Sequence, residues 1–105
     1  MEYIVHRIRL RDIAERERFE SWVRDVDYAT CPQLPSVRTF SVQRVSVEPD
    51  APVHYFEIIG VTDRQAFEAD MGRDAFHALE AEFGKMAEVV DEIAGERIDP
   101  GYVAG

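Results

Sequence analysis

The segment from Val53 to Val61 has the most distinct pattern of apolar and polar positions in the chain. Residues of the β-branched and aromatic types fill it, and Pro52 and Asp63 mark a turn on either side. This composition predicts a central strand whose two faces are both covered. Because side chains alternate along a strand, His54 and Glu57 are expected on opposite faces.

Three other segments alternate in the same way and predict the remaining strands. They are residues 2–10, residues 36–47 and about residues 88–94. The last segment also continues a helical spacing from Met86. We assign it to a strand because three strands need a fourth to complete the sheet and because Gly84 weakens a helix just before it.

Apolar residues at helical spacing predict helices between these strands. The first helix begins after Asp12, which resembles the N-cap of a capping box, and ends near Tyr28. Its inward face is expected to consist of Phe19, Trp22, Val23 and Val26. Residues 62–65, which begin with Thr62, resemble a capping box that starts a short helix. Another helix begins near Asp74. The order β-α-β-β-α-β predicts an α+β, ferredoxin-like fold, in which a four-stranded antiparallel sheet carries helices on one face.

The predicted sheet has one face without helices. The first and third strands are expected at its centre, and apolar residues lie on the uncovered face whichever alternation is used. A second copy of the chain is the simplest cover, so we expect a homodimer. Residues 1–105 are expected to form one domain, with an extended tail over about residues 96–105.

Charge and composition narrow the possible partners. The 21 acidic residues exceed the 12 basic ones, and the net charge of −9 argues against nucleic acid and anionic membranes as partners. Cys31 is the single cysteine, so no intrachain disulfide can form. The sequence has no apolar leader or membrane-length apolar stretch, and we expect a cytoplasmic protein. It also has no glycine-rich phosphate loop, so no cofactor is expected.

Glu57 is the strongest candidate for chemistry. A carboxylate in a covered strand either pairs with an arginine, such as Arg7 or Arg38, or acts as a general acid or base with a raised pKa. His6 and His54 are candidate proton carriers, although either can be a structural histidine.

Other residues are candidates for contact with a ligand. Cys31 is the fourth catalytic candidate, with a buried apolar role as the alternative. The candidates for substrate binding are Trp22, Asp25, Tyr28, Phe40, Phe56 and Phe67. Asp25 was chosen because it and Asp27 oppose the dipole near a helix C-terminus. We expect no metal site, because His54 and Glu57 point to opposite faces and cannot bind one ion together with His6.

Several stretches resemble the RedY-like proteins. They are residues 4–8, 22–32, 40–45, 54–57, 86–90 and 95–98, and the resemblance is most specific over residues 25–32 and 54–57. It implies the dimeric α/β barrel superfamily, in which two ferredoxin-like sheets close into a barrel. It also implies a role in bacterial secondary metabolism, such as a prodigiosin-like or bisindole pathway, at condensation or cyclisation steps on pyrrole or indole precursors.

Three functions therefore compete. The first is a cofactor-independent enzyme that assists condensation or cyclisation of a small aromatic metabolite. The second is a cofactor-free oxygenase of an aromatic, polyketide-like substrate. The third is a non-catalytic binding or chaperone module that holds a reactive intermediate.

Overall fold

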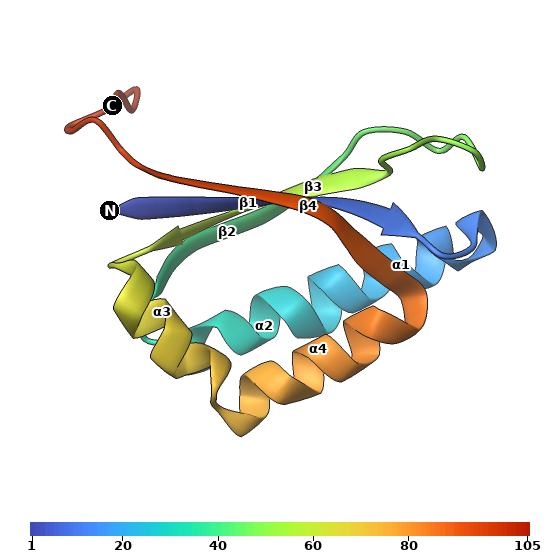
Figure 1. Cartoon of the computed structure of the whole chain (residues 1–105), viewed down its shortest axis with the longest axis horizontal. Helices are drawn as coiled ribbons and strands as arrows, with labels where there is room; N and C mark the ends of the chain where they lie inside the picture. The colour runs from blue at the N-terminus through green and yellow to red at the C-terminus, as the bar shows by residue number, and fades with distance from the viewer.

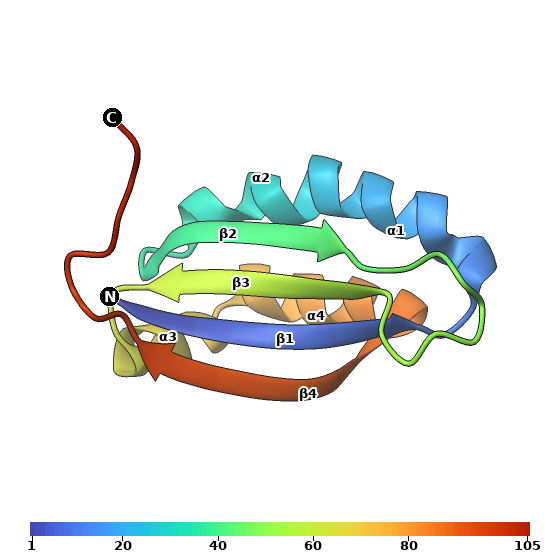
Figure 2. The ribbon, with the colours of Figure 1, turned by 90° about the horizontal axis from the view of Figure 1, so that it is seen from above.

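The strands form one antiparallel sheet in the order β2-β3-β1-β4, as a computed structural model of residues 1–105 shows (Figure 2). The strands are β1 (Glu2–Leu10), β2 (Val37–Arg44), β3 (Tyr55–Val61) and β4 (Ala87–Glu96). The first and third strands are central, and the ambiguous segment near the C-terminus is a strand. The predicted ferredoxin-like fold and these two assignments are confirmed.

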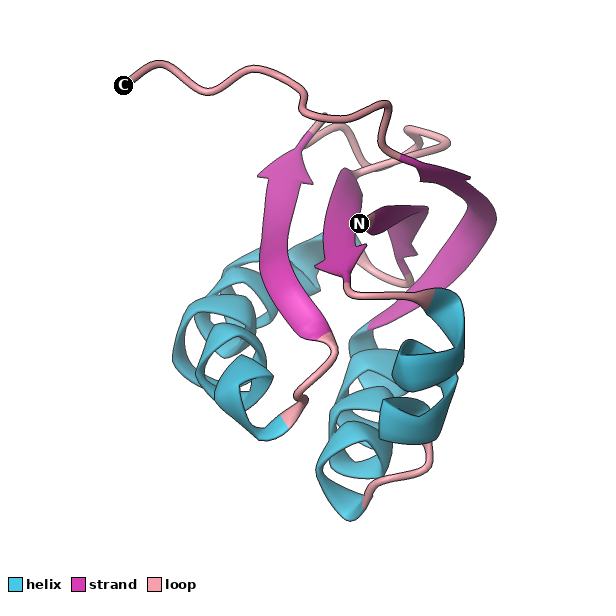
Figure 3. Ribbon diagram, turned by 90° about the vertical axis from the view of Figure 1, so that its left-hand side faces the viewer, coloured by secondary structure: helices cyan, strands magenta, loops and turns pink.

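All the helices lie on one face of this sheet (Figures 1 and 3). They are α1 (Arg16–Trp22), α2 (Tyr28–Thr30), α3 (Arg64–Met71) and α4 (Asp74–Met86). Asp63 begins α3 by accepting a hydrogen bond from the Ala66 N–H at 2.8 Å. The helix is as predicted, but its cap lies one residue after Thr62, the first residue of the predicted capping box. No helix in the structure has both the length and the apolar character that crossing a membrane requires.

Two apolar clusters fill the space between the sheet and the helices. The first centres on Phe19, Ile8 and Tyr55, and the second on Ile4, Val61 and Phe67. The members of β1 and β3 in these clusters come from alternate positions of each strand. One of the two alternating sets of each central strand therefore faces the helices.

The first helix does not keep α-helical spacing to its end. Val23–Asp27 forms a π-helical turn between α1 and α2. Because the hydrogen bonds of a π turn span five residues instead of four, the inward position moves one residue along, from Val26 to Asp27. Val26 is 43% exposed, so its predicted place on the buried face was wrong.

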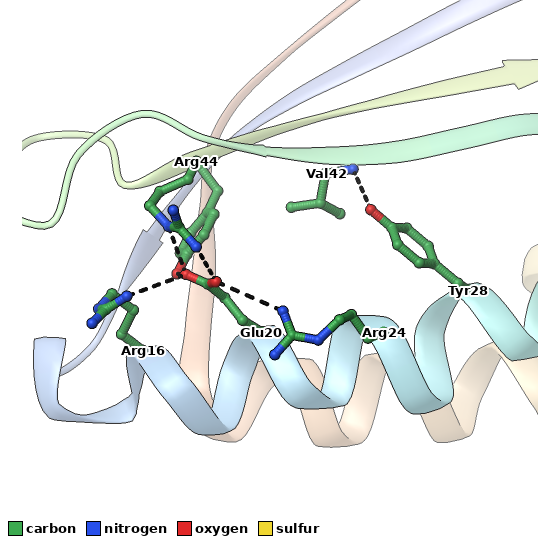
Figure 4. Close-up of polar contacts among 7 residues, drawn as sticks. Arg16, Glu20, Arg24, Tyr28, Val42 and Arg44 are labelled. Carbon is green, nitrogen blue, oxygen red and sulfur yellow. Dashed lines mark hydrogen bonds and ion pairs between the residues drawn. The ribbon is translucent and has the colours of Figure 1, made fainter.

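Glu20 joins α1 to the sheet (Figure 4). Its carboxylate accepts hydrogen bonds from Arg44 Nε of β2 at 2.8 Å and from the Tyr55 hydroxyl of β3 at 2.7 Å. Two further arginines are more distant: Arg16 Nη1 lies 3.8 Å from Glu20 Oε2, and Arg24 Nη1 lies 4.0 Å from Glu20 Oε1. The Arg44 guanidinium, through its hydrogen bonds, lowers the pKa of Glu20 to about 2. Glu20 therefore stays charged at neutral pH and holds the first helix against two strands.

His54 holds the long connection between β2 and β3. The side chain is 1% exposed. Its Nδ1 accepts a hydrogen bond from the Leu10 N–H at 3.0 Å, and its Nε2 lies 2.8 Å from the Glu48 carbonyl oxygen. The neutral imidazole with the proton on Nε2 satisfies both contacts. His54 thus ties the connection to the end of β1.

Apolar residues lie in a row across the sheet face that has no helices. Val5 of β1 pairs with Ile58 of β3 on one side and with Ile93 of β4 on the other. Val5 and Ile58 are half-buried, whereas Ile93 is 64% exposed. This row is the surface on which we expect the second copy to pack.

The first prediction concerns His54. The change His54→Ala removes two hydrogen bonds, leaves the Leu10 N–H without its acceptor and opens a cavity. We expect a free energy of unfolding lower by about 2–4 kcal/mol, which corresponds to a melting temperature lower by roughly 10 °C or more. Thermal melts by circular dichroism measure this. The exposed His77 of α4 supplies the control, His77→Ala, and an equally small effect of both changes would contradict the role given to His54.

The second prediction concerns the open sheet face. The chain has a mass of 12.0 kDa, and we expect light scattering to give twice this mass at micromolar concentration. Ile58→Asp places a charge in the middle of the apolar row and is expected to give a monomer. Ala78→Asp on the exposed side of α4 is expected to leave the dimer intact. A monomeric wild type would contradict the prediction.

Candidate active site

A cavity of about 370 Å³ lies between the sheet and the helices. Twelve of its 18 lining residues are apolar, and the aromatic ones are Trp22, Phe40, Phe67, Phe76 and Phe83. The first three of these are among the predicted substrate-binding residues. The size and the apolar walls suit a small aromatic molecule.

His6 lies between two carboxylates inside this cavity. On the central strand β1, it pairs in register with Glu57 of β3 and Glu92 of β4. Its Nδ1 is 3.2 Å from Glu57 Oε1, and its Nε2 is 2.8 Å from Glu92 Oε1. The hydrogen bond to Glu57 is the main cause that raises the pKa of His6. The doubly protonated imidazolium is the form that donates to both carboxylates.

Glu57 is 14% exposed, and its partner is this histidine. The sequence left open an ion pair with an arginine such as Arg7 or Arg38. Arg7 instead binds Asp91 at 2.9 Å on the open side of the sheet. The alternative with Arg7 was therefore wrong, because Arg7 and Glu57 project from opposite faces.

Asp27 is another acidic residue of the cavity wall. The π-helical turn brings it to the cavity wall. Burial, and then the negative charge of Glu57, raise the pKa of Asp27 to about 7. Near neutral pH Asp27 therefore holds a proton about half of the time, as a general acid requires. Turns of this kind are frequent at functional sites.

Cys31 also lines the cavity. Its thiol donates to the Asp27 carbonyl oxygen at 3.6 Å. Burial and the nearby Asp27 carboxylate raise the pKa of the Cys31 thiol to about 11. The thiol thus keeps its proton at neutral pH, which disfavours the nucleophilic role considered from the sequence.

Four predicted site residues lie outside the cavity. His54 has both ring nitrogens occupied in the β2–β3 connection. Asp25 is exposed on the outer side of the π-helical turn. The Tyr28 hydroxyl accepts a hydrogen bond from the Val42 N–H at 3.0 Å, which ties the helix to β2 (Figure 4). Phe56 projects to the helix-free face of the sheet, opposite to Glu57.

Twelve of the 18 wall residues were not among the predicted site residues, and three charged ones among them bear on the chemistry of the cavity. Asp27 shared with Asp25 the conflict with the helix dipole, but α-helical spacing gave no reason to turn it inward. Glu92 is part of the site because β4 pairs with β1, and this register was not part of the sequence analysis. Arg64 begins α3 and lines the cavity at the end of β3. The sequence marks it only as the start of a helix and gives no sign that it reaches a cavity.

The chain is similar to known proteins over nearly its full length. The family model of the REDY-like protein HapK matches residues 2–98. The crystal structure of HapK from Hahella chejuensis matches with a TM-score of 0.99 and 55% sequence identity, over 100% of both chains. A search of curated proteins returned no match.

More distant structures share the fold. SnoaB, a cofactor-independent oxygenase from Streptomyces nogalater, matches with a TM-score of 0.68 and 17% identity over 94% of each chain. A putative antibiotic biosynthesis monooxygenase from Bacteroides thetaiotaomicron matches with a TM-score of 0.74 and 15% identity, over 99% of this chain and 95% of that one. The family match and the 55% identity over the whole chain show that this protein belongs to the REDY-like HapK family.

Proposed function

We propose that this protein is a small enzyme of secondary metabolism that uses acid–base chemistry on an aromatic intermediate of the pyrrole or indole type. The observation that carries the proposal is the convergence of Asp27 and the His6–Glu57 pair in one largely apolar cavity. Two carboxyl groups in different surroundings can serve as acid and base in one reaction. The resemblance to RedY-like proteins supports condensation or cyclisation as that reaction.

The proposed condensation divides the work between the two carboxyl groups. A ring carbon of the pyrrole or indole attacks a carbonyl carbon, and a C–C bond forms. Asp27 gives its proton to the carbonyl oxygen, and Glu57 takes the proton that the ring carbon loses as aromaticity returns. The new hydroxyl group then takes this proton from Glu57 and leaves as water. The cation that remains loses its pyrrole N–H proton to Asp27, which restores both carboxyl groups to their starting forms.

His6 is a positioning residue in this scheme. It binds Oε1 of Glu57, which leaves Oε2 to face the substrate. Its imidazolium also places a positive charge between the carboxylates of Glu57 and Glu92. Apolar walls strengthen these interactions because they keep bulk water out.

Two competing functions lead to different measurements. A cofactor-free oxygenase, as SnoaB is described, would consume oxygen during turnover. A non-catalytic binding module would bind the aromatic molecule, and removal of one acidic group would not change the rate at which product forms.

The third prediction tests Glu57 as the base. The assay follows the coloured dipyrrin that forms with loss of water from pyrrole-2-carbaldehyde and 2,4-dimethylpyrrole. We expect Glu57→Gln to lower the rate by on the order of 100-fold or more, because the amide cannot accept the ring proton. The melting temperature should stay close to that of the wild type, since glutamine can still accept a hydrogen bond from His6.

The control for this assay is Glu68→Gln, on the exposed side of α3, which is expected to keep the wild-type rate. A normal rate in the Glu57 variant would show that Glu57 is not the base. Oxygen uptake coupled to product formation would favour the oxygenase instead.

The fourth prediction concerns pH and Asp27. The pKa of this carboxyl is about 7 in the folded protein and near 3.9 in an unfolded chain. Between these values the folded state binds the proton more tightly, so the stability due to this proton is present below about pH 4 and is lost as the pH rises to about 7. The wild type should therefore lose melting temperature relative to Asp27→Asn over that range. As Asp27 is the proposed acid, the rate should also fall above about pH 7.

Melts and rates between about pH 4 and 9 measure both effects. Asp25→Asn, two residues earlier and exposed, is the matched control and should follow the wild type. If the difference in melting temperature between wild type and Asp27→Asn does not change with pH, the raised pKa of Asp27 is contradicted.

A further inference from the structure

Two hydrogen-bond donors in the cavity wall have no acceptor within the protein. They are the indole Nε1 of Trp22 and the guanidinium Nε of Arg64, and both atoms are buried. A buried donor without a partner costs about 1–3 kcal/mol of stability, and native proteins contain few of them. Two such donors around one cavity indicate that a bound molecule supplies the acceptors.

Arg64 is a cation without a carboxylate partner. It is the first residue of α3, and its backbone N–H donates to the Glu2 carboxylate. Its guanidinium takes part in none of the ion pairs of the chain. His6, the other basic residue of the wall, is bound to carboxylates through both nitrogens. Arg64 therefore offers the cavity a guanidinium that forms no ion pair within the protein.

The charges of the cavity are separated along the sheet. Glu57 lies in the middle of β3, and Val61, at the end of this strand, is four residues or about 13 Å further on. Arg64 follows beyond Val61, beside Phe67 and Met71 in the cavity wall. An anionic group is therefore attracted to the α3 end of the cavity and repelled from the end that holds Asp27 and Glu57.

We propose that the substrate is an aromatic carboxylate, whose carboxylate group binds Arg64 and whose ring points the reacting carbon toward Glu57 and Asp27. A guanidinium binds a carboxylate through two parallel hydrogen bonds, which fixes direction as well as position. A second acceptor on the same molecule satisfies the Trp22 N–H. The inference rests on the proposed function, since it describes the substrate of the same cavity, and the carboxylate is an anchor that takes no part in the reaction.

The test compares two probes of the same shape, biphenyl-4-carboxylate and biphenyl-4-carboxamide. Trp22 is the single tryptophan, so a ¹⁵N-labelled sample gives one indole N–H signal, and its shift in a titration gives the dissociation constant. We expect the carboxylate to bind at least tenfold more tightly than the carboxamide. Arg64→Gln should abolish this preference, and Arg64→Lys should keep part of it, since it keeps the charge.

Arg38→Gln is the matched control, because Arg38 is exposed on β2 outside this cavity. It should keep the full preference for the carboxylate. Arg64→Gln should melt at or above the wild-type temperature, as its guanidinium has no partner to lose. A large loss of melting temperature in this variant would instead show that Arg64 has a structural role.

Three outcomes would overturn the inference. They are equal affinity for the two probes, no shift with either probe up to about 1 mM, and a preference for carboxylate that persists in Arg64→Gln. The titration needs no turnover, so its failure is distinct from that of the proposed function, which depends on the rate of Glu57→Gln.

Discussion

The pairing of β1 with both of its neighbours is the constraint on which the site depends. This register places His6 opposite Glu57 on one side and opposite Glu92 on the other. A slip of one residue in either pairing would move a carboxylate to the other face of the sheet. Without His6, the carboxylates of Glu57 and Glu92 would have no basic group between them in a cavity that Asp27 also lines. The sheet register and the charge state of the cavity are therefore linked.

Much of the fold was predictable because it rests on periodicity. The alternation of the segment around β3 predicted a central strand, and this strand lies between β2 and β1. The parts that could not be predicted depend on departures from periodicity or on packing. No residue pattern in the sequence indicates the π-helical turn. Val26 was therefore expected on the buried side of the helix, where Asp27 lies instead, and Val26 is exposed. Alternation also cannot tell which face the helices cover, and for this reason Phe56 was grouped with residues of a cavity that it does not reach.

The cavity departs from the rules that stabilise an ordinary protein interior. Well-packed cores leave few voids and few unpaired donors, yet this chain keeps an apolar space of about 370 Å³ with buried N–H groups of Trp22 and Arg64 unpaired. It also keeps Asp27 in a place that disfavours its charge. Such departures are expected where function requires them, and the rest of the structure must compensate. Two sets of hydrogen bonds contribute to this compensation. Glu20 joins the first helix to two strands, and His54 joins the β2–β3 connection to the end of β1.

The proposed site and the expected dimer surface lie on opposite sides of the sheet. The cavity lies between the sheet and the helices of one chain, whereas the row of Val5, Ile58 and Ile93 lies on the other side of the same sheet. A second copy on that row would be separated from the cavity by the thickness of the sheet. Any influence of such a partner on Glu57 must then pass through β3, where Ile58 is the next residue and faces the other way. Assembly would act on the site by holding this strand in place, and the groups that exchange protons would all come from one chain.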